Sequence, residues 1–99
     1  MQRGGYIYII SNKNRTVLYT GVTSNLVSRI YEHKVGEGSK FAKKYNCTDL
    51  LYFETFPDIE SAIKKEKQMK KWKREYKENV INELNPDWRD LYEDISEYN

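Results

Sequence analysis

The chain contains only one cysteine, Cys47, and only one histidine, His33, among its 99 residues. A single cysteine forms no internal disulfide, so the reducing cytoplasm is the expected compartment. A zinc site built from a histidine or cysteine cluster is excluded for the same reason. No apolar run approaches the length of a membrane span, and the amino-terminal residues do not resemble a signal peptide. We therefore expect a cytoplasmic protein with no membrane partner.

Several common enzyme motifs are also missing. The sequence contains no phosphate-binding loop, no dinucleotide-binding fingerprint and no G-x-S-x-G nucleophile elbow. What is present is a composition typical of a globular protein, with 38% hydrophobic, 32% charged and 14% aromatic residues, and nine tyrosines. Because repeats and low-complexity stretches are absent, the sequence predicts one domain over residues 1–99, with its core at about 5–92.

The net charge of +2 conceals a strong asymmetry along the chain. Residues 1–77 carry 16 Lys and Arg against 8 Asp and Glu, whereas residues 78–99 carry 1 against 7. The segment 64–77 alone holds 8 basic and 2 acidic side chains. Such a segment forms either a solvated helix face or a surface that binds a phosphate backbone. The acidic end either packs elsewhere or keeps the chain soluble.

Residue patterns predict the element order β-β-α-β-α-α. Two runs rich in Ile, Val and Tyr flank an Asn-containing turn, which is typical of a β-hairpin. Thr23 or Ser24 is expected to cap the first helix and Asp58 the second. The expected elements are strands 5–11 and 16–22, a helix from about 24 to 35, a strand 49–56, helices 59 to about 72 and 74–84, and a helical turn near 88–95.

Two strand tyrosines and two helix residues are candidates for chemistry. Tyr8 and Tyr19 share a face of the expected sheet if the hairpin register permits, although strand tyrosines most often serve packing. Arg29 and His33 are four residues apart, about 40° around the helix, beside its apolar stripe. Their alternative role is that of ordinary surface residues, with Glu32 as an ionic neighbour.

Glu66 occupies a position where helical spacing favours an apolar residue, three after Ile63 and three before Met69. A carboxylate there costs several kcal/mol unless it is paired or bound to a metal. One explanation is an edge position, or a salt bridge to Arg29 or to a lysine. The other is a single carboxylate ligand for Mg²⁺, completed by water and phosphate oxygens.

The order of these residues resembles the GIY-YIG nuclease family. The first family motif corresponds to Tyr6-Ile7-Tyr8, with Tyr in place of Gly, and the second to Tyr19-Thr20-Gly21, with Thr in place of Ile. The stretches 19–34, 61–66 and 85–92 also resemble the small single-domain members. The resemblance covers about residues 5–92, and it rests on five weak motifs that occur in the family order.

The resemblance implies an α+β fold in which helices flank a three-stranded antiparallel sheet. It also implies DNA cleavage with one divalent cation per site, Mg²⁺ or Mn²⁺, held by Glu66. Arg29 would stabilise charge on the scissile phosphate. Tyr19 is favoured as the base and Tyr8 as the residue that positions the water or phosphate, and the reverse assignment stays open. His33 would share in the proton transfer.

Two further positions follow from the resemblance. Asn85 corresponds to a late asparagine of many relatives and is expected to support the site. Val22 stands where some relatives carry a lysine, so one cation near the phosphate is missing. Family members commonly gain target choice from an added domain, so we expect structure-selective or weakly specific cleavage, or a protein partner that supplies the choice. The oligomeric state stays open.

DNA is the expected partner, bound by basic side chains around the site. These residues are Lys40, Lys43, Lys44, Lys70, Lys73 and Arg74. Two alternatives remain, namely a nucleic-acid-binding module that keeps the fold without the chemistry, and a small protein-interaction domain. Salt dependence separates binding of nucleic acid from binding of protein, because phosphate binding weakens steeply with salt whereas a mainly apolar contact does not.

Overall fold

The structure is a computed structural model that describes residues 4–98. Its elements are β1 (Gly5–Ser11), β2 (Leu18–Thr23), α1 (Leu26–Lys34), α2 (Lys40–Lys44), β3 (Asp49–Phe56), α3 (Ile59–Met69), α4 (Arg74–Leu84) and the 3₁₀ segment η1 (Tyr92–Tyr98). The α+β class is confirmed, and the short helix α2 is an addition to the expected order. Residues 1–3 and 99 of the expected domain lie outside the described residues. Within residues 4–98, no helix has the length and apolar character needed to cross a membrane.

The three strands form one antiparallel sheet in the order β2-β1-β3. In the hairpin, Tyr8 pairs with Gly21 and Ile10 pairs with Tyr19. Directly paired residues point to the same face, and so do residues two apart on one strand. Tyr8 and Tyr19 therefore lie on one side of the sheet, and β2 forms the sheet edge next to them.

The strand β2 begins at Leu18, two residues later than the expected start at Thr16. The Oδ1 atom of Asn12 accepts hydrogen bonds from the backbone N–H groups of Thr16 and Val17, at 2.9 and 3.1 Å. These two residues thus belong to a loop closed by an asparagine side chain and do not join the ladder. Arg15 in this loop has a positive φ of 60°.

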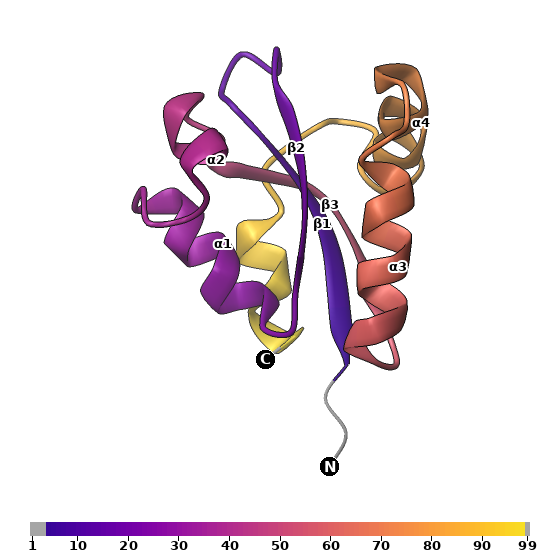
Figure 1. Ribbon diagram of the computed structural model, residues 1–99. Helices are drawn as coiled ribbons and strands as arrows, with labels where there is room; N and C mark the ends of the chain where they lie inside the picture. The colour runs from indigo at the N-terminus through magenta and orange to yellow at the C-terminus, as the bar shows by residue number, and fades with distance from the viewer. Residues whose placement is uncertain (1–3, 99) are drawn as a thin grey trace.

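Helices cover both faces of the sheet, which stands between them in Figure 1. On one face, α1 and η1 pack against the even-numbered residues of β1, including Tyr8 and Ile10. On the other face, α3 and α4 pack against the odd-numbered residues Ile7 and Ile9. The alternation of side chains along β1 therefore divides the interior into two small cores, one on each side of the sheet.

The helix α1 begins one residue after the expected capping positions. Asn25 is its cap and accepts a hydrogen bond from the backbone N–H three residues on, at 3.2 Å. Thr23 instead accepts from the N–H of Asn25 at 3.1 Å, so its hydroxyl stabilises the turn before the helix. The expectation of Thr23 or Ser24 as cap was therefore wrong. The cap of α3 at Asp58 is confirmed, because its carboxylate accepts an N–H of the first turn at 2.7 Å.

Fewer apolar residues of α3 are buried than the helical spacing of its apolar residues indicated. Ala62 and Met69 are fully buried, but Ile63 is 36% exposed. Glu66 is only 8% exposed and lies on the buried side of the helix, as the spacing indicated. Because α3 contacts both β1 and β2, this carboxylate belongs to the side of the helix that faces the hairpin.

Candidate active site at the edge of the sheet

The phenol of Tyr8 lies across its strand neighbour Gly21 on β2. A Cβ atom at Gly21 would lie 2.8 Å from Cε1 of Tyr8 and closer still to its Cζ and hydroxyl. Glycine at this position therefore leaves the space through which the ring passes over β2. The hydroxyl of an almost completely buried tyrosine is in this way brought toward the edge of the sheet.

Two side chains of α1 hold the hydroxyl of Tyr8. The Nε2 atom of His33 lies 2.9 Å from it, and Nε of Arg29 donates a hydrogen bond to it at 3.4 Å. Residues four apart on a helix are neighbours on its surface, so both reach the same atom. His33 is 3% exposed, and its Nδ1 makes no hydrogen bond within residues 4–98. Gly38 closes over the imidazole, because a Cβ there would lie 2.9 Å from Cγ of His33.

Burial sets the protonation states of this cluster. It raises the pKa of Tyr8 to about 12, although the hydrogen bond and positive charge of Arg29 act in the opposite direction. Burial, together with the charge of Arg29, lowers the pKa of His33 to about 4. The hydrogen bond to Tyr8 raises the pKa of Arg29, which keeps its charge. At neutral pH the cluster therefore contains a neutral phenol, a neutral imidazole and a guanidinium.

Glu66 lies near the same phenol although its helix covers the opposite face of the sheet. Its negative charge contributes to the raised pKa of Tyr8. The ammonium of Lys70 contacts Oε2 of Glu66 at 3.2 Å and lies 5.6 Å from the centre of the Tyr19 ring. The salt bridge to a lysine that the sequence offered as one explanation is thus present. It leaves Oε1 of Glu66 without a hydrogen bond in the described part of the chain.

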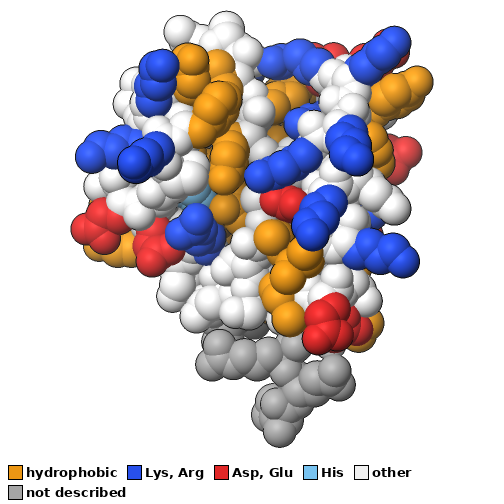
Figure 2. Space-filling model, in the orientation of Figure 1, with side chains coloured by type: hydrophobic (Ala, Val, Ile, Leu, Met, Phe, Trp, Pro, Cys, Tyr) orange, Lys and Arg blue, Asp and Glu red, His pale blue; other side chains and the backbone are white. Residues whose placement is uncertain are grey.

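Tyr19 connects the two halves of the site. Its ring centre lies 6.5 Å from that of Tyr8 and 5.9 Å from that of His33, and it stacks on Phe41 of α2 at 5.7 Å. The structure therefore brings all five residues expected to be catalytic to the β2 edge, from β1, β2, α1 and α3. Figure 2 shows this face, where hydrophobic side chains form a column over α2 and β2 with Lys and Arg side chains on both sides.

Asn85 does not join the other expected site residues. Its amide nitrogen donates to the backbone carbonyls of Leu51 and Arg89, at 3.2 and 2.7 Å, and its Oδ1 accepts from the N–H of Arg89 at 3.3 Å. Leu51 belongs to β3, the strand at the opposite edge of the sheet from β2. The side chain of Asn85 closes the turn after α4, and all its polar atoms are used there.

The basic residues expected to bind DNA include one that is committed elsewhere. All six are exposed, namely Lys40, Lys43, Lys44, Lys70, Lys73 and Arg74. Arg74, however, donates to the carbonyls of Thr16 and Arg15, at 2.9 and 2.6 Å, and pairs with Glu78 at 2.8 Å. Its guanidinium holds the hairpin loop against the start of α4 and has fewer donors left for a phosphate.

A pocket of about 530 Å³ beside Tyr19 was missed by the sequence reasoning. Tyr19 and Phe41 line it together with Lys70 and Lys77. Burial and the positive charge of Lys70 lower the pKa of Lys77, which makes no salt bridge within residues 4–98. In the sequence, nothing distinguishes Lys77 from the other basic residues of the segment 64–77. Thr20 also lines the pocket, and its buried Oγ1 has no hydrogen-bond partner in the described chain.

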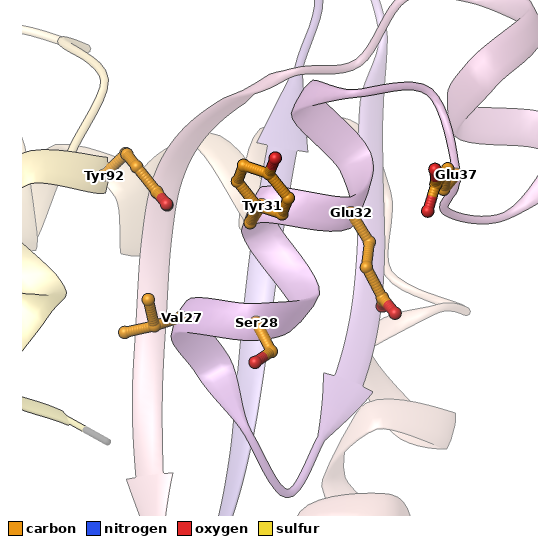
Figure 3. Close-up of a pocket in the computed structure, with 6 residues that line it drawn as sticks. All are labelled: Val27, Ser28, Tyr31, Glu32, Glu37 and Tyr92. Carbon is orange, nitrogen blue, oxygen red and sulfur yellow. The ribbon is translucent and has the colours of Figure 1, made fainter.

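A second pocket, of about 440 Å³, has a different chemistry. Figure 3 shows its six labelled residues, which come from α1, the loop after α1 and the C-terminal segment. Glu32 and Glu37 contribute two carboxylates, and no Lys or Arg is among the described residues that line it. Because carboxylates repel phosphate, this pocket is unsuited to a nucleic acid backbone.

Glu66 is the side chain at this edge that fits a divalent cation. The described residues contain no group of three or more His, Cys, Asp or Glu side chains that could hold a metal ion. A cation here would therefore have one nearly buried carboxylate and would take its other ligands from water and phosphate oxygens. That donor set suits Mg²⁺ or Mn²⁺ and excludes a structural zinc site.

Comparison with protein families gives a match to the GIY-YIG catalytic domain over residues 4–79. The chain is also similar to a UPF0213 protein of Haloquadratum walsbyi, with 33% identity over 79% of this chain and 86% of the relative. UPF0213 proteins of Staphylococcus haemolyticus and Clostridium perfringens are 36% and 38% identical, over 79% and 78% of this chain and 94% and 82% of the relatives. The comparison with solved structures gives no significant match.

Proposed function

The chain belongs to the GIY-YIG family, a family of nuclease-type catalytic domains, and we propose that it is an endonuclease that hydrolyses DNA phosphodiester bonds with one divalent cation. The convergence of a guanidinium, two phenols and a carboxylate at the β2 edge carries the proposal. Phosphodiester hydrolysis uses these groups to bind phosphate, hold a metal and move a proton. A module that only bound DNA would gain nothing from this carboxylate, which repels phosphate unless a cation intervenes.

The proposal assigns phosphate binding to Arg29. Its Nε donates to Tyr8 and its Nη1 to Glu32 at 3.1 Å, whereas Nη2 makes no hydrogen bond within residues 4–98. A third of the side chain is exposed, so a phosphate can reach it. The planar guanidinium donates parallel hydrogen bonds to phosphate oxygens, and its bond to Tyr8 fixes the plane in which it does so.

The proposal assigns metal binding to Glu66. A cation held there would supply Lewis-acid polarisation of the phosphate and would neutralise charge that develops on it. Glu66 holds its carboxylate at a nearly buried position, where interactions between charges are stronger than in water. Lys70 lies 3.2 Å from Oε2, so its positive charge partly offsets the negative charge of the carboxylate.

The two tyrosines receive different roles. A pKa of about 12 keeps Tyr8 protonated at neutral pH, so its phenolate is scarcely available as a base, and its bonds to His33 and Arg29 hold its hydroxyl in one orientation. Tyr8 therefore positions the attacking water or the phosphate as a neutral hydrogen-bonding group. Tyr19 lies at the pocket and near the ammonium of Lys70, which favours a negative charge there, so the phenolate form of Tyr19 is the better candidate to accept the proton of the water. The neutral imidazole of His33 supports this step by keeping Tyr8 in place.

A cleavage panel tests the proposal. Fluorescent duplex, nicked, branched and single-stranded DNA are incubated with the protein in Mg²⁺, in Mn²⁺ and in EDTA. We expect cleavage of at least one substrate with metal and none in EDTA. Glu66→Gln and Arg29→Ala should each lower the rate by at least about 100-fold, because each removes a charged group from the transition state. Glu60→Gln, at an exposed site in the first turn of the same helix, is the matched control and should cut like the wild type.

Cleavage that persists in EDTA, or a Glu66→Gln variant that cuts at the wild-type rate, would overturn the proposal. The tyrosine roles are tested in the same assay. Tyr19→Phe should lose about 10²- to 10⁴-fold, the usual contribution of a general base, and Tyr8→Phe should lose less. The opposite ranking would exchange the two roles. Circular dichroism on every variant ensures that a lost rate is not a lost fold.

A further inference from the structure

Three aromatic rings lie in contact beside the proposed catalytic residues. The rings of Tyr19 and Phe41 are stacked, with centres 5.7 Å apart and planes at 26°, and the centres of Phe41 and Tyr45 are 4.8 Å apart. Phe41 is 47% exposed and Tyr45 is 39% exposed. Exposed apolar rings that cluster instead of scattering commonly mark a binding surface.

The pocket next to these rings also offers groups that suit a phosphate. Lys70 and Lys77 line it together, and burial of Lys77 near the charge of Lys70 lowers the pKa of Lys77. An anion between two ammonium groups relieves their repulsion. Thr20 is 3% exposed, and its Oγ1 has no hydrogen-bond partner within residues 4–98. A buried hydroxyl without a partner is unusual in a protein, and this one belongs to a residue that lines the pocket.

We propose that this pocket binds an unpaired nucleotide of single-stranded DNA next to the cleaved bond, with the base stacked on Phe41 and a phosphate held by Lys70 and Lys77. The inference rests on the proposed function and names its substrate class, DNA with an unpaired segment. A volume of about 530 Å³ lies in the usual range for ligand pockets. The ring of Phe41 stacks on that of Tyr19, so a base on Phe41 is close to the proposed proton acceptor.

The combination of rings and lysines favours a single strand over a duplex. Bases inside a duplex already stack on each other, so a protein ring can stack only on a base that is unpaired or extruded. Binding to a duplex backbone would require the lysines alone and would leave the exposed ring of Phe41 without a role. A basic groove that carries aromatic side chains is the usual arrangement of proteins that bind single strands.

Binding in EDTA tests this inference without cleavage. Fluorescence anisotropy measures the affinity of the protein for a labelled thymidine oligonucleotide and for a blunt duplex of the same length. Phe41→Ala should weaken binding of the single strand roughly 5- to 150-fold, the range for loss of one stacked base, and change duplex binding less than about twofold. Phe41→Leu should weaken it nearly as much, because leucine keeps the apolar volume but has no π-face. Tyr31→Ala, at an aromatic that is 56% exposed in the acidic pocket, is the control and should bind like the wild type.

Equal binding of the single strand by wild type and Phe41→Ala would overturn the inference, and so would equal weakening for single strand and duplex. Wild-type affinity in Phe41→Leu would also overturn it, because apolar contact alone would then suffice. The outcome is separable from that of the cleavage panel. Wild-type protein that binds the single strand as expected but never cuts refutes the nuclease proposal and leaves the pocket standing. Protein that cuts but ignores Phe41 refutes only the pocket.

Discussion

Substitution of Gly21 by alanine is expected to disable the site through a single methyl group. The new Cβ would lie 2.8 Å from Cε1 of Tyr8, and nearer to its Cζ and hydroxyl, so the ring must move. Overpacking of this kind costs about 1–3 kcal/mol. Loss of the 2.9 Å hydrogen bond between Tyr8 and His33 adds about 1 kcal/mol. Alanine also has less conformational freedom than glycine in the unfolded chain, which stabilises the folded state by about 0.4–1 kcal/mol. The net loss of stability is therefore about 2 kcal/mol.

The measurement is a double-mutant cycle in urea, followed by circular dichroism. In wild-type background Gly21→Ala should lower the free energy of unfolding by about 2 kcal/mol. In a Tyr8→Leu background the same change should be neutral or stabilising, because leucine lacks the ring atoms that clash. Gly36→Ala is the control, since Gly36 has a φ of 80° but no atom within 4 Å of its added Cβ. Its strain of about 1 kcal/mol should be the same in both backgrounds.

Gly21→Ala should also lower the rate of cleavage, and by more than its loss of folded protein explains. Displacement of a catalytic hydroxyl by about 1 Å can cost on the order of 10²-fold in rate, so Gly21→Ala should be nearly inactive at temperatures where it is fully folded. If Gly21→Ala costs the same stability in both backgrounds, the passage of Tyr8 over the edge strand is not what requires glycine. The reasoning that places this hydroxyl at the sheet edge would then fail.

Two further predictions concern His33 and Arg74. The pKa of His33 falls from 6.5 to about 4 on folding, so the unfolded chain binds the extra proton, and this contribution to stability is complete above pH 6.5 and lost as the pH falls toward 4. The free energy of unfolding should therefore drop by up to about 3 kcal/mol more in wild type than in His33→Gln between pH 7 and pH 4, and parallel pH profiles would contradict the buried neutral imidazole. Arg74→Ala should lose about 1–2 kcal/mol of stability in urea, because two hydrogen bonds to the hairpin loop disappear. The salt dependence of its DNA binding should match wild type, whereas a slope smaller by about one would show that Arg74 contacts phosphate.

The elements that could be predicted from the sequence are those set by local signals. The strand 49–56 and the helix 74–84 have the expected bounds, because a continuous apolar run and a helical period each end at a clear turn signal. The cap at Asp58 is equally local. The start of β2 and the cap of α1 were wrong because the side chains of Asn12 and Thr23 bind nearby backbone groups, a competition that composition does not reveal.

The site shows a similar division. Spacing alone indicated that Glu66 lies on a buried stripe, and the motif order selected the residues that converge on the β2 edge. The hydrogen bonds from Arg74 to the hairpin loop and from the Asn85 amide to β3 could not be predicted from the sequence. Both join residues more than thirty positions apart. Lys77 and the buried hydroxyl of Thr20 were missed for the same reason, since a pocket arises only when distant segments pack.

The sheet separates the helix that carries Arg29 from the helix that carries Glu66, and this has a consequence for synthesis. The guanidinium and the carboxylate reach the same edge of the sheet from opposite faces, so the site needs the hairpin and the docked helix α3 together. A nascent polypeptide still held by the ribosome therefore has no competent centre, and neither does a fragment that stops before residue 66. If the proposed function holds, nucleic acid would meet this chemistry only in molecules whose folding is finished.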